Sequence, residues 1–245
     1  MKKLLLLLIA SLLLPGHSEA SHAAGGEIYY RYIGDSTGTS HEYEFNLILY
    51  RREQGIGFGT AQTLDIASSC FINTSLTLNQ VPGKSNATIP FSGECVDTNS
   101  SAYEKYTYYH YRGTKVLSGI CHDYKFSWSQ CCRNSNITNL ASNTNFYFEA
   151  TLNNTLGPNN SPRFANFGIK SLCVNRKVNW SQKALEPDSD SLVYELAQPS
   201  PLPIHPLLMR LVTTCNNPLL RKMAYNLTPE MGISSLRPCS QITPP

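Results

Sequence analysis

The fold is decided near the middle of the chain by the stretch CHDYKFSWSQCCRN, residues 121–134. It begins with one cysteine and ends with the adjacent pair Cys131 and Cys132, followed by Arg133 and Asn134. Between them, Phe126 and Trp128 stand two residues apart, so both side chains point to the same face of a β-strand. Adjacent cysteines in ordinary trans backbone point their side chains apart, so each needs a distant partner. The stretch therefore predicts a central strand that disulfides tie to two other parts of a β-sandwich, and not an active site.

The N-terminus predicts export. Lys2 and Lys3 precede an almost unbroken apolar run over residues 4–14, and Ser18-Glu19-Ala20 supplies small residues for cleavage. This is the pattern of a secretory signal peptide, residues 1–20. No later stretch approaches the roughly 20 apolar residues of a transmembrane helix, so we expect a secreted or cell-surface protein without a transmembrane segment. Removing residues 1–20 takes away Lys2, Lys3 and Glu19 and lowers the net charge from +3 to +2, which gives no electrostatic reason to expect nucleic acid as a partner.

The chain has 8 cysteines, and an even number favours disulfides in an exported protein. Six lie between Cys70 and Cys173, where the pairing stays open, and Cys215 with Cys239 is the simplest pairing for the other two. Zinc is the alternative, but no C-x-x-C pair occurs and the spacing in 121–132 is not that of a usual ligand set. The cysteines expected to form disulfides are Cys70, Cys95, Cys121, Cys131, Cys132, Cys173, Cys215 and Cys239.

Alternation of apolar and polar residues predicts strands along most of the chain. The apolar faces are Tyr43, Phe45, Leu47 and Leu49; Ile72, Thr74, Leu76 and Leu78; and Phe146, Phe148, Ala150 and Leu152. Residues 21–32 lead into a first strand, and short strands are expected at 173–174, 177–180 and 192–196. Glycine-rich segments at 34–40 and 55–59 predict a turn and a loop. No convincing amphipathic helix occurs, so the predicted class is all-β.

Turn-forming residues divide the chain. The segment 153–162 is rich in Asn, Gly and Pro and is the best candidate for a domain boundary. We expect a disulfide-stapled antiparallel β-sandwich over 21–157 and a partial Ig- or cadherin-like β-sandwich over 158–197. Pro199, Pro201, Pro203 and Pro206 forbid a central strand at their positions. Residues 198–245 are therefore expected to form a proline-rich, poorly ordered tail.

Two groups of side chains are candidate sites. Tyr106 and Tyr108 would share one face of a strand with Tyr109 and Tyr111 on the other, either as aromatic cross-strand partners or as a platform for sugars or peptides. Glu186, Asp188 and Asp190 place three carboxylates at alternate positions, a donor set that suits Ca²⁺. The calcium-loop pattern fails because Ser191 stands at the tight-turn glycine. A solvated acidic turn is the alternative.

Several stretches together carry a family likeness: residues 21–28, 43–51, 128–134 with 137–139, 150–155, 160–164 and 186–194. They resemble the N-terminal region of exported Bacteroidetes surface proteins, described as gliding-motility-associated or PKD-domain-containing and carried by type IX secretion. The resemblance implies further β-sandwich repeats and a C-terminal sorting domain, whereas this sequence ends at Pro245 without either. It also implies interdomain calcium, although the usual Asp-Pro-Asp-Gly-Asp is here Glu-Pro-Asp-Ser-Asp, residues 186–190.

These observations predict a non-catalytic, exported β-sandwich module of a bacterial cell-surface or extracellular protein, adhesive or structural and associated with gliding motility. We expect a surface glycan or protein as partner and no cofactor other than Ca²⁺. His41-Glu42 lacks the second histidine of a zinc protease, because Phe45 stands there, and no Gly-x-Ser-x-Gly elbow occurs. No catalytic residue is therefore predicted. The alternatives are a carbohydrate-binding accessory module and a secreted polysaccharide hydrolase with the tyrosine-rich strand lining a cleft.

Overall fold

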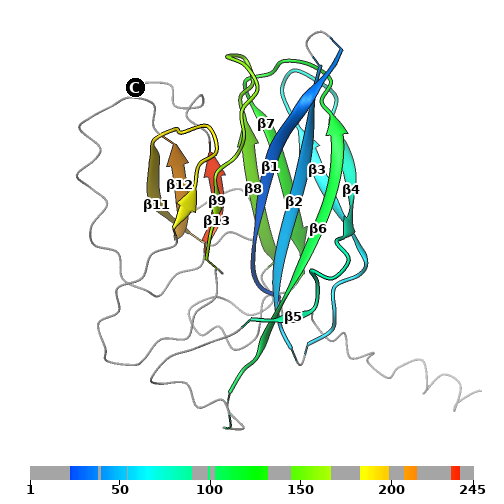
Figure 1. The fold of residues 1–245 in the computed structure, drawn as a ribbon, viewed down its shortest axis with the longest axis vertical. Helices are drawn as coiled ribbons and strands as arrows, with labels where there is room; N and C mark the ends of the chain where they lie inside the picture. Colours follow the sequence, from blue (N-terminus) through cyan, green and yellow to red (C-terminus); the bar gives the residue numbers. More distant parts are fainter. Residues whose placement is uncertain are drawn as a thin grey trace, which may run out of the picture.

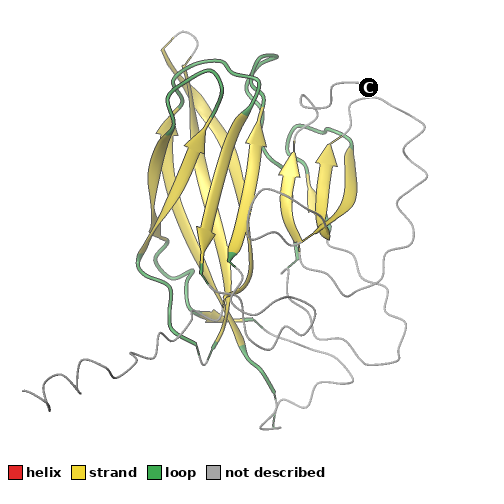
Figure 2. Ribbon diagram, turned by 180° about the vertical axis from the view of Figure 1, so that it is seen from behind, coloured by secondary structure: helices red, strands yellow, loops and turns green. Residues whose placement is uncertain are grey.

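The computed structural model describes residues 23–37, 40–53, 55–89, 99, 103–131, 145–166, 183–198, 207–213 and 233–237. Every regular element in these ranges is a strand, which confirms the all-β class (Figure 2). The strands are β1 (Ala23–Thr37), β2 (Ser40–Arg52), β3 (Ala61–Ala67), β4 (Thr74–Gln80), β5 (Ala87–Thr88), β6 (Tyr106–Val116), β7 (Tyr124–Gln130), β8 (Phe146–Leu152), β9 (Arg163–Phe164), β10 (Ala184–Leu185), β11 (Leu192–Gln198), β12 (Leu207–Thr213) and β13 (Ile233–Arg237).

The main sheet is antiparallel and folds over on itself. Its strand order is β1-β2-β6-β4-β3-β7-β8, with β5 added beside β6. In Figure 1, β1, β2 and β6 lie in front of β8, β7 and β3. The turn between the layers lies where β4 pairs with β6 at only two positions, Asn79 with Arg112 and Gln80 with Tyr111. The result is the predicted sandwich, with both inner faces turned toward one core.

Aromatic rings fill that core. The ring of Phe126 on β7 lies 4.6 Å from the ring of Phe45 on β2 and 5.4 Å from that of Tyr30 on β1, centroid to centroid. Because β7 belongs to one layer and β1 and β2 to the other, these contacts join the two layers. Each such ring buries a large apolar surface, and the tilted geometries are those that aromatic pairs prefer.

The predicted alternation is confirmed on three strands. Tyr43, Phe45, Leu47 and Leu49 are fully buried; Phe126 and Trp128 are buried; and so are Phe146, Phe148, Ala150 and Leu152. Two positions of the face predicted over 72–78 were wrong: Ile72 is 95% exposed and precedes β4, and Thr74 is exposed at the start of β4, where only Leu78 is fully buried. The expected turn at 34–40 is also shorter, because β1 continues to Thr37 and β2 begins at Ser40.

A close approach explains the glycine at position 26. A Cβ atom there would lie 2.5 Å from the carbonyl oxygen of Ile48 on the paired strand and 2.9 Å from the ring of Phe148. The neighbouring backbone cannot move aside without breaking the β1–β2 pairing. Only glycine therefore fits at this position.

The segment predicted to be a domain boundary packs on the main sheet. The backbone N–H of Tyr30 donates to Oγ of Ser161 at 2.7 Å, and the N–H of Ser161 donates to the carbonyl of Tyr30 at 3.0 Å. Asn160 accepts from the N–H of Tyr32 through its side-chain oxygen at 2.8 Å. At Tyr30 and Tyr32 the outer edge of β1 is therefore covered by residues 160–161.

Smaller sheets follow in the chain. β9 pairs with β10, and β12 lies between β11 and β13, pairing parallel with β13. β11 confirms the strand expected at 192–196, whereas those expected at 173–174 and 177–180 lie outside the described residues. β12 and β13 lie in the proline-rich tail, where no strand was expected. β12 begins at Leu207 and β11 ends at Gln198, so none of the four prolines at 199–206 lies within a strand.

Candidate functional site at one end of the sandwich

Three loops meet at one end of the sandwich, and we name them together the loop end. They are residues 68–73 between β3 and β4, residues 117–123 between β6 and β7, and residues 153–157 after β8. A disulfide joins Cys70 to Cys121, with the two Cα atoms 5.9 Å apart. The Cys70 residue is exposed, whereas Cys121 is 1% exposed.

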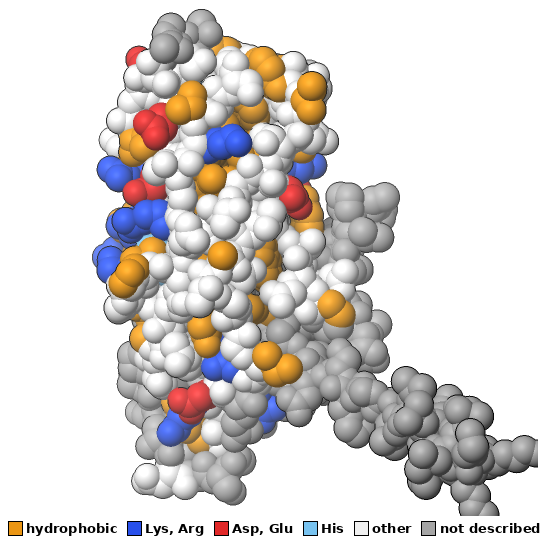
Figure 3. Space-filling view, turned by 90° about the vertical axis from the view of Figure 1, so that its right-hand side faces the viewer, with side chains coloured by type: hydrophobic (Ala, Val, Ile, Leu, Met, Phe, Trp, Pro, Cys, Tyr) orange, Lys and Arg blue, Asp and Glu red, His pale blue; other side chains and the backbone are white. Residues whose placement is uncertain are grey.

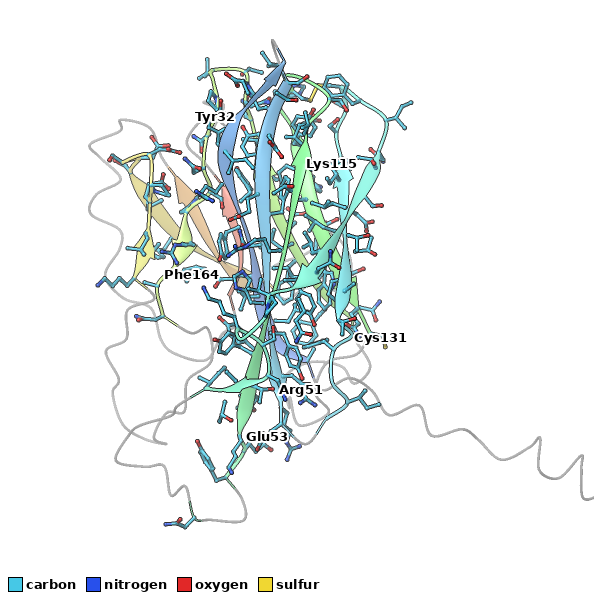
Figure 4. All side chains as sticks on the ribbon, turned by 45° about the vertical axis from the view of Figure 1, so that its right-hand side comes forward. Tyr32, Arg51, Glu53, Lys115, Cys131 and Phe164 are labelled. Carbon is cyan, nitrogen blue, oxygen red and sulfur yellow. A yellow bond between two sulfur atoms is a disulfide. The ribbon has the colours of Figure 1, made fainter. Side chains whose placement is uncertain are left out.

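The central strand is tied at both ends, as its cysteines predicted. Cys121 precedes β7 and bonds to Cys70, and Cys131, directly after β7, is also disulfide-bonded. Figure 4 labels Cys131 toward the opposite end of the sandwich from Tyr32. The partner of Cys131 lies outside the described residues, as do Cys95, Cys132, Cys173, Cys215 and Cys239.

A buried asparagine joins the third loop to the second, residues 117–123. Asn154 is fully buried, and its side-chain oxygen accepts the backbone N–H of Cys121 at 2.7 Å. Its side-chain nitrogen donates to the carbonyl of Gly119 at 3.2 Å, and its backbone N–H donates to the carbonyl of Cys121. Asn154 therefore satisfies backbone groups that would otherwise be buried without partners.

Two polar side chains flank the disulfide. Oδ1 of Asp123 lies 2.9 Å from Sγ of Cys121, and Nδ1 of His122 lies 4.0 Å from Sγ of Cys70. Both carboxylate oxygens of Asp123 accept the backbone N–H of Ser69, at 3.1 and 3.2 Å. Burial raises the pKa of Asp123, but the hydrogen bonds from Ser69 and the nearby His122 outweigh it and lower this pKa overall. The ligand atoms of Cys70, Cys121, His122 and Asp123 all lie within 4.8 Å of one another.

Aliphatic side chains project from the same loops. Ile72 is 95% exposed, Leu156 is 87% exposed, and Ile120 is 42% exposed. Ile72 lies two residues from Cys70, Ile120 is next to Cys121, and Leu156 lies two residues from Asn154. The three side chains therefore belong one to each loop of the loop end.

The four tyrosines of the predicted platform point to opposite faces of β6. Tyr109 and Tyr111 are buried in the core, where their hydroxyls donate to the side chain of Asn86 and the carbonyl of Gly59. Tyr106 and Tyr108 lie half-buried on the outer face. Only these two are therefore placed where a ligand could reach them.

The outer face of β6 also carries a buried histidine that no motif predicted. Nε2 of His110 lies 2.7 Å from Oδ1 of Asn46, which is 1% exposed. Burial lowers the pKa of His110 to about 4, assisted by the positive charges of Arg112 and Lys84. His110 is therefore neutral at pH 7.

The predicted calcium ligands do not converge. Asp188 accepts hydrogen bonds from the backbone and side-chain nitrogens of Asn160, both at 2.7 Å, so its carboxylate fixes the boundary segment. Glu186 accepts the backbone N–H of Asp188 at 3.0 Å, and burial raises the pKa of Glu186 to about 7. Within the described ranges, the one group of metal-ligating side chains at metal-binding spacing is that around the Cys70–Cys121 disulfide.

A second carboxylate with a raised pKa lies on the outer face of β1. Burial raises the pKa of Glu27 to about 7, opposed by the backbone N–H of Phe164 and the charge of Arg163. The N–H of Phe164 lies 3.4 Å from Oε2 of Glu27, and Figure 4 labels Phe164 beside the main sheet. Glu27 therefore couples the β9 segment to β1.

The surface between these features is mixed in charge. Figure 3 shows basic, acidic and hydrophobic side chains interspersed over one face of the molecule. Glu44 contributes by pairing with both Arg31 and Arg112. Among the residues that the structure describes, no helix has the length and apolar character needed to cross a membrane.

Comparison of the chain with protein-family models, with curated proteins and with solved structures finds no match. The resemblance to Bacteroidetes surface proteins therefore stays a prediction.

Proposed function

We propose that this chain is a non-catalytic, exported β-sandwich module of a bacterial cell-surface or extracellular protein, and that it binds a partner protein through the loop end. The supporting observation is the exposure of Ile72 and Leu156 on loops that a disulfide and Asn154 fix in place. Export and association with gliding motility rest on the leader and on the family resemblance.

Rigid loops on a β scaffold are a common place for binding residues. Side chains held before binding lose less conformational entropy in a complex, so more of the contact energy appears as affinity. The Cys70–Cys121 bond and the hydrogen bonds of Asn154 supply that rigidity at the loop end. Fully burying one isoleucine or leucine side chain contributes about 1.5–3 kcal/mol.

The chemistry of the exposed side chains favours a protein partner. Ile72, Ile120 and Leu156 are aliphatic, and an aliphatic cluster is buried well by an apolar pocket on another protein. Sugar recognition would instead use aromatic faces, and the outward tyrosines lie on β6. Because the side chains of Ile72, Ile120 and Leu156 carry no charge, we expect an affinity for the partner that changes little with salt concentration.

The test is adhesion of the oxidised, purified chain to bacterial cells and to immobilised extracellular protein. We expect Ile72→Ser with Leu156→Ser to weaken binding at least about tenfold, since the two side chains together supply several times 1.4 kcal/mol. The matched control is Ile56→Ser, because Ile56 is 47% exposed in the loop between β2 and β3. Equal binding by the double variant and the control would refute a role for the loop end.

A carbohydrate-binding accessory module is the second candidate, because Tyr106 and Tyr108 face outward from β6. A glycan array distinguishes it: retention of a sugar that Tyr108→Ala abolishes and Ile72→Ser leaves unchanged would select this function. Turnover of the same glycan, lost on replacing one Asp or Glu, would instead select a polysaccharide hydrolase.

A further inference from the structure

We infer that two-electron reduction of the Cys70–Cys121 disulfide converts it into a four-ligand site for Zn²⁺ or a similar thiophilic divalent cation. The ligands are the two freed thiolates, His122 and Asp123. The metal ligands are not the exposed side chains Ile72 and Leu156 proposed above to contact a partner, although the same disulfide supports both sites.

The donor set is the first reason. Zinc prefers four ligands drawn from cysteine sulfur, histidine nitrogen and carboxylate oxygen, with metal–ligand distances of about 2.0–2.3 Å. Ligands on a tetrahedral centre then lie about 3.3–3.8 Å apart. The four ligand atoms here already lie within 4.8 Å of one another, so rotation of the side chains suffices once the sulfurs are separate.

The second reason is that the site is already held in place. The backbone N–H of Ser69 binds both oxygens of Asp123. The backbone of Cys121 is bonded to Asn154 in both directions. Such outer contacts orient metal ligands and strengthen binding. Three of the ligands come from the single loop 117–123, and only Cys70 must arrive from its neighbour.

The third reason is electrostatic. Breaking the disulfide leaves the Cys121 sulfur beside the carboxylate of Asp123, 2.9 Å away in the oxidised form, so loss of the thiol proton there brings two negative charges together. Two adjacent negative charges repel each other strongly in a partly buried setting. A bound divalent cation cancels that repulsion. The same arrangement that disfavours free thiolates therefore favours the metal-bound reduced form.

The exposed sulfur gives a reductant access. One thiolate of a dithiol attacks Sγ of Cys70, the Cys70–Cys121 bond breaks, and its electron pair stays on Cys121. The second thiol of the reagent then displaces Cys70, and the reagent leaves as its own disulfide. Overall the dithiol is oxidised, the protein disulfide is reduced, and two protons are released when the cation binds both thiolates.

The first experiment measures Co²⁺ binding to the reduced full-length chain by visible absorption, with circular dichroism to follow the fold. We expect the unmodified chain to bind one more tetrahedral, thiolate-ligated Co²⁺ than Cys70→Ala with Cys121→Ala, whatever the other cysteines contribute. His122→Ala and Asp123→Asn keep both thiols, and each should weaken the affinity of that Co²⁺ at least about tenfold. Equal stoichiometry in the double variant, or unchanged affinity in both single variants, would overturn the inference.

The second experiment does not depend on the double variant folding. The oxidised chain is equilibrated in thiol redox buffers at fixed free Zn²⁺, and alkylated Cys70 and Cys121 are quantified by mass spectrometry. Because zinc binds only the reduced form, the reduction potential of this pair should rise by about 30 mV for each tenfold increase in free Zn²⁺ above its dissociation constant. The His122→Ala variant should need higher zinc for the same shift. A potential independent of zinc would overturn the inference.

Discussion

Removing the Cys70–Cys121 disulfide tests how far this bond stabilises the sandwich. The bond closes a loop with a sequence separation of 51 residues. Opening a loop of that length returns chain entropy to the unfolded state, and the loop-closure relation gives about 4 kcal/mol at 25 °C. We therefore expect Cys70→Ala with Cys121→Ala to lower the free energy of unfolding by that amount. For a chain of this size the melting temperature should fall by about 8–16 °C.

The assay is equilibrium unfolding in urea followed by circular dichroism, under oxidising conditions so that other disulfides persist. Ile72→Ser is the matched control, since that exposed side chain lies two residues from Cys70 and should change stability by less than about 0.5 kcal/mol. A loss below about 1 kcal/mol in the double variant, with the control unchanged, would show that the hydrogen bonds from Ser69 to Asp123 hold the two loops together without the covalent bond.

Four further changes have defined outcomes. Phe126→Ala removes the ring that joins the two layers and should cost about 3–5 kcal/mol in urea unfolding, whereas Leu156→Ala should cost less than about 0.5. Asn154→Ala leaves the N–H of Cys121 and the carbonyl of Gly119 without partners and should cost about 1–3 kcal/mol per group; a smaller loss would mean that water replaces the amide. Gly26→Ala should cost about 1–3 kcal/mol through overlap with Ile48, and a neutral result would show that β1 can shift. The folded-state pKa of Glu27 is raised from 4.5 to about 7, so the folded chain binds a proton that the unfolded chain has lost, and this contribution to stability falls as pH rises from about 4.5 to 7. His110 acts in the opposite sense, because its contribution to stability is lost as pH falls from 6.5 toward 4. The test is therefore the difference in the free energy of unfolding between Glu27→Gln and the unmodified chain, which should be near zero at pH 4.5 and up to about 3 kcal/mol in favour of the variant at pH 8. A difference that does not change with pH would contradict this prediction.

Period-two patterning made the main strands predictable, because one buried face imposes strict alternation on each strand. The patterns of β2, β7 and β8 have four, two and four predicted apolar positions, and all of these are buried. Ile72 failed because the strand begins after it, and the pattern alone does not mark where a loop ends.

The site was harder to predict, because its parts come from loops brought together by strand pairing. β3 was missed: its apolar face has only Leu64 and Ile66, too few for a clear alternation. Yet β3 pairs with β7 through Ile66 and Phe126 and through Ala67 and Lys125. Continuing that register brings residue 70 opposite residue 122, and so next to Cys121. The disulfide therefore follows from the pairing of β3 with β7, which no local pattern predicts.

Asn154 was missed for a different reason. It lies in a segment whose Asn, Gly and Pro content predicts turns and a domain boundary. In the structure its side chain accepts the N–H of Cys121 and donates to the carbonyl of Gly119, in place of backbone partners. A buried asparagine that serves other loops cannot be distinguished from a turn asparagine by composition.

The contact of residues 160–161 with β1 has a consequence for how the chain behaves when it is shortened. An uncovered strand edge offers a row of unpaired N–H and C=O groups to any extended peptide. A fragment ending at residue 157 would lack Asn160 and Ser161. The backbone groups of Tyr30 and Tyr32 that bond to them would then be unpaired. Such a fragment should polymerise or capture a strand from another molecule, whereas a fragment extended past Ser161 should remain monomeric. The position at which the chain is truncated, before or after Ser161, should therefore determine whether the fragment is monomeric or aggregates.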